Sequence, residues 1–163
     1  MTTANPRSTC DLCDDFPDSV QVLEPLFHCY GGVNSFHGPI TTLRCLDDNG
    51  LLREILATPG NKRVLIVDGG GSRRRALFGD QLAGRALSNN WAGVLINGAV
   101  RDVAALSGSP IGVFALCAVP MRGGRQGSGE VDVEVRFAGA SLKPGAMLYA
   151  DANGIIVAER PLV

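Results

Sequence analysis

Three polar residues in the middle of the chain have the types and spacing of a site for an organic acid and a metal ion. They are Asp80 and, after twenty intervening residues, the adjacent pair Arg101 and Asp102. A guanidinium group matches a carboxylate in two parallel hydrogen bonds, and Mg²⁺ prefers carboxylate oxygens while keeping several waters. Arg101 would then hold an acid, Asp102 the metal, and Asp80 a metal-bound water. The residue types alone leave a structural role open, because Asp80 could simply be a charge at a helix start.

The elements around these residues predict where they lie. The segments 63–67, 93–96 and 111–119 are short apolar runs, typical of strands that are buried on both faces of a parallel sheet. Between the first two runs, residues 79–89 have helical apolar spacing, and residues 101–106 begin a short helix after the second run. Ligands bind outside the carboxyl ends of parallel strands. We therefore expect Asp80, Arg101 and Asp102 to meet at one sheet edge, where helix-start amides of 79–82 could hold an anionic oxygen.

The rest of the chain predicts a single layered α/β domain over residues 1–163, with a parallel α/β centre and a C-terminal antiparallel β region. Residues 1–8 are expected to be a frayed start. The remaining predicted elements are a helix over 9–16 capped by Ser8 or Thr9, a strand over 35–46, a helix over 50–57 capped by Asn49, a strand over 130–137, and a hairpin of 147–150 and 155–158 around Asn153-Gly154.

Glycine and arginine clusters give weaker signals. The loop Gly69-Gly70-Gly71 follows a strand, but the dinucleotide-binding pattern fails because Arg74 replaces a required glycine. Arg73-Arg74-Arg75 is typical of a solvated or ion-paired surface, although contact with an anionic substrate or RNA stays open. The glycine-rich stretch 123–129, with Arg122 and Arg125, is either a mobile loop near a site or a plain surface connection.

Composition excludes several classes of function. The formal net charge is −1, so no global field favours nucleic acid or a membrane, and we expect no direct nucleic-acid binding. No apolar run reaches the roughly 18 residues of a membrane span. The five cysteines are odd in number and irregularly spaced, which indicates reduced thiols in a cytoplasmic protein.

The spacing of Asp80, Arg101 and Asp102 resembles the signature of class II 4-hydroxy-4-methyl-2-oxoglutarate aldolases. The same family includes the regulator of ribonuclease activity A, a protein inhibitor of ribonuclease E. The resemblance extends over nearly the whole chain and is closest to the regulator branch. It is carried by the blocks VLEPLF (22–27), DNGLL (48–52), VDGGGS (67–72), GAVR (98–101) and LYAD (148–151).

The resemblance implies a homotrimer with a swivelling β/β/α fold and sites near subunit contacts. It implies that Arg101 binds the keto acid, that Asp102 holds a divalent metal, and that Gly79, Asp80, Gln81 and Leu82 contact the substrate. The metal would be Mg²⁺, with Mn²⁺ or Co²⁺ as alternatives. Longer aldolases have a C-terminal extension that reaches a neighbouring site, so a contribution from a neighbouring subunit stays open for this chain.

Two functions follow as expectations. The first is retro-aldol cleavage of 4-hydroxy-4-methyl-2-oxoglutarate to two pyruvates, with oxaloacetate decarboxylation as a secondary activity. The second is a non-catalytic regulator that binds and inhibits ribonuclease E. Some members of the regulator branch lack the carboxylate after the arginine, so the presence of Asp102 favours the enzyme. A lysine Schiff base is disfavoured, because the two lysines, Lys62 and Lys143, lie in turn-like contexts.

Overall fold

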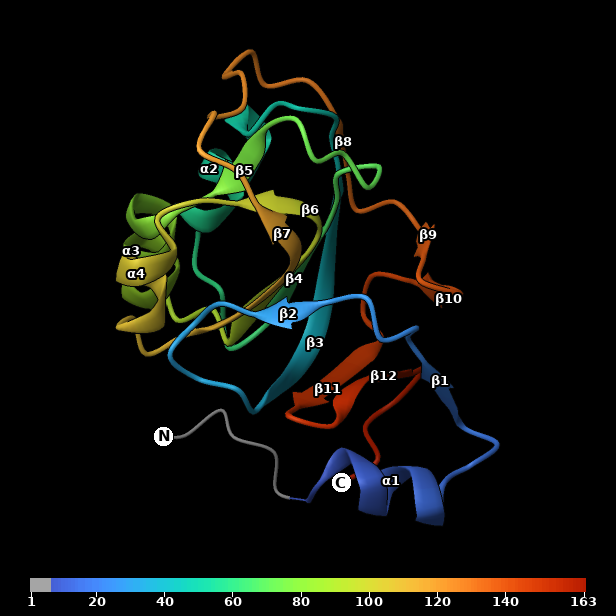
Figure 1. Cartoon of the computed structure of the whole chain (residues 1–163). Helices are drawn as coiled ribbons and strands as arrows, with labels where there is room; N and C mark the ends of the chain where they lie inside the picture. Colours follow the sequence, from blue (N-terminus) through green and yellow to red (C-terminus); the bar gives the residue numbers. More distant parts are fainter. Residues whose placement is uncertain (1–6) are drawn as a thin grey trace.

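The computed structural model describes residues 7–163 and forms a mixed sheet, with three helices on one face of its parallel centre and the N-terminal helix beside the C-terminal hairpin (Figure 1). The helices are α1 (Thr9–Asp15), α2 (Gly50–Leu56), α3 (Asp80–Ser88) and α4 (Val103–Ser107). The strands are β1 (Val20–Val22), β2 (His28–Cys29), β3 (Phe36–Arg44), β4 (Val64–Asp68), β5 (Ala76–Phe78), β6 (Gly93–Val100), β7 (Gly112–Ala118), β8 (Glu130–Val131), β9 (Val135–Phe137), β10 (Ala140–Leu142), β11 (Met147–Asp151) and β12 (Gly154–Ala158).

The centre of the sheet is parallel, as the apolar runs predict. The C-terminal half of β3 pairs with β4, β4 with β6, and β6 with β7, all in parallel. The first four residues of β4 and the first four of β6 are buried, which explains their continuously apolar sequence. Helices α2, α3 and α4 cover one face, where their apolar side chains share a core with β4, β6 and β7 (Figure 1).

Strand β3 joins this parallel centre to an antiparallel region. Its first residues, 36–39, pair antiparallel with β11, whereas residues 40–44 pair with β4. The predicted hairpin of β11 and β12 is present, and β1 extends it as an outer strand. A second core lies between the other face of the parallel strands and this hairpin. The α/β architecture with a C-terminal antiparallel region is therefore confirmed.

The predicted elements differ from the structure in three places. The segment 130–137 is not one strand, because Asp132 has a left-handed backbone (φ 59°) and separates β8 from β9. The short strand β5, between the arginine cluster and α3, was not predicted at all. At the N-terminus, residues 1–6 lie outside the described residues. The frayed start does not extend to Ser8, whose hydroxyl group accepts the backbone N–H of Asp11 and caps α1.

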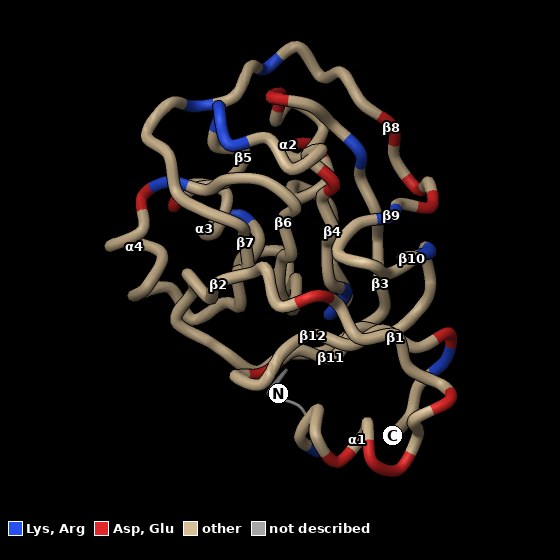
Figure 2. Tube along the Cα trace, turned by 45° about the vertical axis from the view of Figure 1, so that its right-hand side comes forward, with Lys and Arg blue, Asp and Glu red and all other residues tan. Residues whose placement is uncertain are grey.

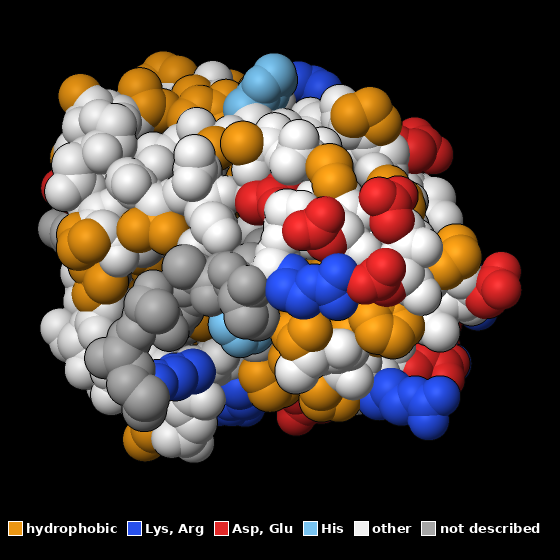
Figure 3. Space-filling model, turned by 90° about the horizontal axis from the view of Figure 1, so that it is seen from below, with side chains coloured by type: hydrophobic (Ala, Val, Ile, Leu, Met, Phe, Trp, Pro, Cys, Tyr) orange, Lys and Arg blue, Asp and Glu red, His pale blue; other side chains and the backbone are white. Residues whose placement is uncertain are grey.

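Charge is unevenly distributed over the molecule. Basic residues gather at the end where β5 and its neighbouring loops lie, whereas acidic residues follow α1 at the opposite end (Figure 2). Seen from below, that opposite face carries acidic side chains beside hydrophobic ones (Figure 3). In residues 7–163, no helix has both the length and the apolar character needed to cross a membrane.

Candidate active site

Three neighbouring parallel strands place the candidate residues at one edge of the sheet. Strand β5 pairs with β6 so that Phe78 lies opposite Val100, and Val100 in turn lies opposite Ala118 of β7. The backbone N–H of Arg101 donates to the carbonyl of Phe78 at 2.9 Å. The chain therefore leaves all three strands at the same edge. The expected strand before Asp80 was β4, but the strand that delivers it is the unpredicted β5.

The structure brings together every residue that the sequence predicts for the site. A cavity of about 290 Å³ is lined by all of them and by six further residues. The predicted residues are Gly79, Asp80, Gln81, Leu82, Arg101 and Asp102, and the additional ones are Asn49, Arg53, Ala76, Phe78, Arg122 and Arg125.

Asp102 is held in an unusual position by its backbone and by Gly79. Its φ and ψ are 59° and 42°, a left-handed conformation that aspartate adopts more readily than most residues. Although it precedes α4, its side chain forms no capping bond to that helix. The carboxylate instead turns towards α3, where its Oδ2 accepts the backbone N–H of Asp80 at 3.2 Å. A Cβ atom on Gly79 would lie 2.4 Å from this Oδ2, so glycine is needed for the close approach.

The helix-start amides are therefore only partly free for a ligand. The N–H of Asp80, which the sequence assigns to substrate contact, is already bonded to Asp102. The N–H groups of Gln81 and Leu82 lie in the first turn of α3, where an α-helix supplies no carbonyl partner. These two amides remain the candidates for holding an anionic oxygen.

The Arg101 side chain is half-buried and weakly engaged. Its Nη1 donates to the carbonyl of Pro120 at 3.5 Å, which is at the long limit of a hydrogen bond. Among the described residues it forms no ion pair with a carboxylate. Within residues 7–163, the N–H donors of this guanidinium group therefore remain available to bind a carboxylate.

A buried aspartate fixes the loop that forms the other wall of the cavity. Asp48 is 5% exposed, and its carboxylate accepts the backbone N–H groups of Gly50, Gln126 and Gly127 at 2.9, 2.7 and 3.0 Å. Burial raises the pKa of Asp48, but backbone N–H donors, including that of Ser128, outweigh it, and the pKa lies below its ordinary value. The glycine-rich stretch is thus a wall of the site held by a carboxylate, and its two arginines line the cavity.

Asn49 has a different role from the predicted one. It is the N-cap residue of α2, but its side chain makes no capping bond. Its Nδ2 donates to the carbonyl of Leu77 at 3.4 Å, and its Oδ1 is buried without a partner among the described residues. A buried acceptor without a donor costs about 1–3 kcal/mol, and such groups occur at functional sites. The sequence predicts a helix cap at Asn49 because capping is the commonest role of Asn before a helix.

The other arginine-rich segment is mostly structural. Arg74 forms an ion pair with Asp47 at 2.8 Å, and the same carboxylate accepts the hydroxyl group of Ser72 at 2.6 Å. Asn97 and the backbone of Gly70 bond to Asp68 at the glycine turn. The ion-paired interpretation is therefore confirmed for Arg74, and the Asp68 carboxylate orders the glycine loop by accepting the N–H of Gly70 and the amide of Asn97.

The donor set bears on the expected metal. In the described part of the chain, no group of three or more His, Cys, Asp or Glu side chains is arranged to hold a metal ion. A single carboxylate at Asp102, beside Asp80, nevertheless suits Mg²⁺, which usually takes one or two protein carboxylates and completes its shell with water and substrate oxygens. The residues present therefore fit a mostly hydrated ion.

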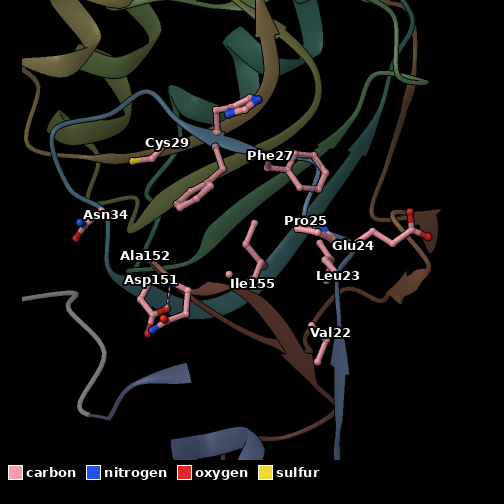
Figure 4. Close-up of a pocket in the computed structure, with 14 residues that line it drawn as sticks. Val22, Leu23, Glu24, Pro25, Phe27, Cys29, Asn34, Asp151, Ala152 and Ile155 are labelled. Carbon is pink, nitrogen blue, oxygen red and sulfur yellow. Dashed lines mark hydrogen bonds between the residues drawn. The ribbon is translucent and has the colours of Figure 1, made fainter. Parts of the chain in front are cut away.

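A larger cavity at the other end of the sheet lacks this chemistry. It has a volume of about 590 Å³, and its lining is mainly apolar side chains from β1, the segment before β2 and the β11–β12 hairpin (Figure 4). Of its two carboxylates, Glu24 and Asp151, the latter already accepts the N–H and hydroxyl groups of Thr9 and the N–H of Asn153. Among residues 7–163, no arginine or lysine lines it and its one basic side chain is His28, so it lacks the guanidinium group that pairs with a carboxylate through two hydrogen bonds.

Comparison with known proteins identifies the family. The model of the RraA-like family, described as Aldolase/RraA, matches residues 9–157. The chain belongs to the Aldolase/RraA family. A relative from Xanthomonas campestris pv. campestris (strain 8004), named "Putative 4-hydroxy-4-methyl-2-oxoglutarate aldolase", is 57% identical over 155 residues, which cover 95% of this chain and 93% of the relative. A relative of the same name from Pseudomonas fluorescens (strain SBW25) is 50% identical over 154 residues, covering 94% of each chain.

Solved structures of the Aldolase/RraA fold agree with this assignment. The RNA-processing inhibitor RraA from Thermus thermophilis has a TM-score of 0.94 and 42% identity, with 98% of this chain and 96% of that chain covered. A Geobacillus kaustophilus structure described as S-adenosylmethionine: 2-dimethylmenaquinone methyltransferase has a TM-score of 0.92 and 47% identity, with 96% and 97% covered. The relatives and solved structures carry three different functional names, so the shared fold does not determine the function. The function has to be inferred from the residues of the site.

Proposed function

We propose that this protein is a metal-dependent aldolase that cleaves 4-hydroxy-4-methyl-2-oxoglutarate into two pyruvates. The observation that carries the proposal is the convergence of Arg101, Asp102 and Asp80 in one arginine-lined cavity. The names of the relatives at 50–57% identity support the same substrate. Neither Lys62 nor Lys143 lines the cavity, which favours a metal-assisted route over a Schiff base.

The residues of the chain divide the work of binding and orientation. Arg101 binds the carboxylate next to the keto group in a bidentate pair. The N–H groups of Gln81 and Leu82 hold an anionic oxygen at the start of α3. Asp102 would hold a divalent ion, which would supply Lewis acidity for the keto group and for the developing enolate charge.

The reaction transfers one proton and breaks the C3–C4 bond. Asp80 acts as the base through a water that it orients: the water takes the proton of the C4 hydroxyl group and passes one of its own protons to the Asp80 carboxylate. The C3–C4 bond breaks, the C4 fragment leaves as pyruvate, and the electron pair of that bond becomes the enolate of a second pyruvate, beside the Arg101 guanidinium. The Asp80 carboxyl group then returns its proton to C3 through the same water, which completes the second pyruvate. Oxaloacetate decarboxylation passes through the same enolate and is the proposed secondary activity.

The charge of the cavity wall adds an expectation about the metal. Four arginines and two aspartates line the cavity, so the wall carries an excess of two positive charges. A cation alone is repelled by this excess, whereas a keto acid brings negative charge and two oxygen ligands of its own. We propose that the metal and the acid bind more tightly together than separately.

Removal of the metal or of either central side chain tests the proposal. Pyruvate release from 4-hydroxy-4-methyl-2-oxoglutarate is followed with Mg²⁺, with chelator, and in the variants Arg101→Ala and Asp102→Asn. Asparagine at 102 also tolerates the left-handed backbone, so the fold is preserved. We expect each change to lower kcat/KM by about 10²-fold or more. Full turnover in excess chelator contradicts the mechanism.

A second function is supported by one observation. The Thermus thermophilis relative of known structure is described as an RNA-processing inhibitor. We propose binding to ribonuclease E as the alternative function, and a homotrimer as the assembly in either case, since the family resemblance implies both. A pull-down with ribonuclease E, run beside the pyruvate assay, separates the regulator from the aldolase. A mass measurement by light scattering tests the homotrimer. Ribonuclease E capture without pyruvate formation favours the regulator.

A further inference from the structure

Three arginines in the candidate active site have no role in the mechanism above. Arg53 comes from α2, whereas Arg122 and Arg125 come from the loop after β7. All three line the same cavity as Arg101 and Asp80. Within residues 7–163, none of the three forms an ion pair with a carboxylate. They form a group of unneutralised cations beside the proposed acid-binding residue.

These cations repel one another. The neighbouring guanidinium of Arg53, followed by that of Arg122, lowers the pKa of Arg125, and burial and Arg101 add smaller effects in the same direction. Arginine stays protonated in proteins, so this repulsion is not relieved by loss of a proton. An anion placed among the side chains would relieve it.

The group is also held in place by the backbone around it. Besides the bonds from 126–127 to Asp48, the loop is paired with β5, where the N–H of Gly123 donates to the carbonyl of Ala76 at 2.8 Å. The N–H of Ala76 donates to the carbonyl of Met121 at 2.7 Å, so Arg122 lies between two backbone bonds. The N–H of Asn49 donates to the carbonyl of Gly124 at 2.8 Å, which ties the loop to the start of the helix that carries Arg53. The arginines therefore start from a fixed frame, which lowers the entropy cost of binding an anion.

We propose that Arg53, Arg122 and Arg125 form a second anion subsite, which binds the distal carboxylate of a dicarboxylic 2-oxo acid. Arg101 would hold the carboxylate next to the keto group, so the two ends of one small dianion are bound at two places. The inference rests on the proposed function for the orientation of the substrate. The cavity volume of about 290 Å³ suits an acid of this size, since it lies at the small end of ligand pockets.

The subsite makes a prediction about specificity. 2-Oxoglutarate and 2-oxopentanoate have the same chain length and the same keto-acid end, and they differ in the distal carboxylate. Neither can undergo the retro-aldol reaction, because neither has a C4 hydroxyl group, so their binding is independent of turnover. We expect the protein with Mg²⁺ to bind 2-oxoglutarate at least about tenfold more tightly, as charge-assisted hydrogen bonds predict.

The test measures this preference by titration calorimetry in matched variants. In Arg53→Gln and Arg125→Gln the affinity ratio of the two acids is expected to fall towards one, and in Arg53→Lys to recover in part. Arg73→Gln is the control, because Arg73 is an exposed arginine of the same end of the molecule that does not line this cavity. Thermal melts of each variant verify folding. The control is expected to keep the wild-type ratio.

The outcomes separate this inference from the proposed function. An equal affinity of the wild type for both acids, or a ratio unchanged in both glutamine variants, overturns the subsite. The pyruvate assay is run on the same samples. A wild type that prefers 2-oxoglutarate but releases no pyruvate leaves the subsite standing and refutes the aldolase. Turnover with no preference refutes the subsite alone.

Discussion

At the scale of single residues, the absence of a side chain at position 79 shapes the site as much as the charged groups do. The backbone of Gly79 is extended (φ −154°), a conformation open to any residue, so conformational freedom is not the reason for glycine. The reason is space, because the carboxylate of Asp102 occupies the volume that a Cβ would take. Gly79 thereby allows Asp102 to reach the first turn of α3.

Gly79→Ala is expected to abolish most of the activity while leaving the fold intact. The added methyl group would push the Asp102 carboxylate from its place, and displacement of a site group by about 1 Å can cost about 10²-fold in rate. The measurement is kcat/KM for pyruvate release, with a thermal melt of each protein. Gly84→Ala is the control, since a Cβ there meets nothing within 4 Å and alanine favours a helix. Equal activity of the two variants would show that Gly79 is not needed to place the Asp102 carboxylate for activity.

The sequence predicts some residues of the site and misses others for physical reasons. Asp80, Arg101 and Asp102 follow from residue type and from the rule that parallel strands end at one edge. Arg53 carries no such signal, because it lies in the middle of a helix and joins the site only when the loop after β7 folds over it. Arg53 and the loop arginines come together through tertiary contacts, which no local sequence pattern predicts.

At the scale of elements, the second part of the loop of residues 121–129 is held by one carboxylate. Asp48 lies beneath it and accepts N–H groups from both the loop and the start of α2. Backbone bonds to β5, Asp47 and Asn49 fix only the first part of the loop, up to Gly124. The position of Arg125 is therefore set by Asp48, which acts as a positioning residue and does not itself line the cavity.

Asp48→Asn is expected to raise KM for the dicarboxylate substrate and to lower stability by about 1–3 kcal/mol, since buried N–H groups lose an acceptor. Asp47→Asn is the matched control, because its carboxylate bonds Ser72 and Arg74 instead of the loop amides. Urea unfolding and steady-state kinetics are measured for both. If Asp47→Asn raises KM as much as Asp48→Asn does, the effect reflects general loosening, and Asp48 has no positioning role.

The elements themselves are predicted unevenly. The parallel centre is found from the sequence because strands buried on both faces must be continuously apolar. Strand β5 escapes prediction because it has only three residues and follows three arginines. The alternating segment 130–137 has the pattern of a strand, but the left-handed backbone of Asp132 interrupts it. Alternation reports which side chains face inward and does not report where the backbone turns.

At the scale of the whole molecule, hydrogen-bonded carboxylates link stability to pH. The pKa values of Asp48 and Asp151 are lowered by N–H and hydroxyl donors that outweigh the opposing effect of burial, and that of Asp47 is lowered first by the hydroxyl group of Ser72. A carboxyl group with a lowered folded pKa stabilises the fold above its unfolded pKa and loses that contribution as the pH falls through the folded value.

The free energy of unfolding is therefore expected to fall when the pH drops below the ordinary aspartate value of 3.8. Urea unfolding at pH 7, 5, 4 and 3 measures it, and the loss is expected to begin between pH 4 and 3. Asp48→Asn should show a shallower loss over this interval, because one of the linked groups is gone. A stability that is the same at pH 3 as at pH 7 would contradict this account.

The separation of charge between the two ends of the molecule affects how small solutes arrive. The net charge of the protein is only −1. Basic residues at the β5 end and acidic residues along α1 nevertheless give it an electric dipole (Figure 2). An approaching dianion is drawn to the arginine-bearing pole and turned away from the other, a kinetic gain that fades as the Debye length shrinks to about 8 Å at physiological salt. In the proposed reaction the same field attracts each pyruvate, with one negative charge, less strongly than it attracts the dianionic substrate, which favours substrate capture over product retention.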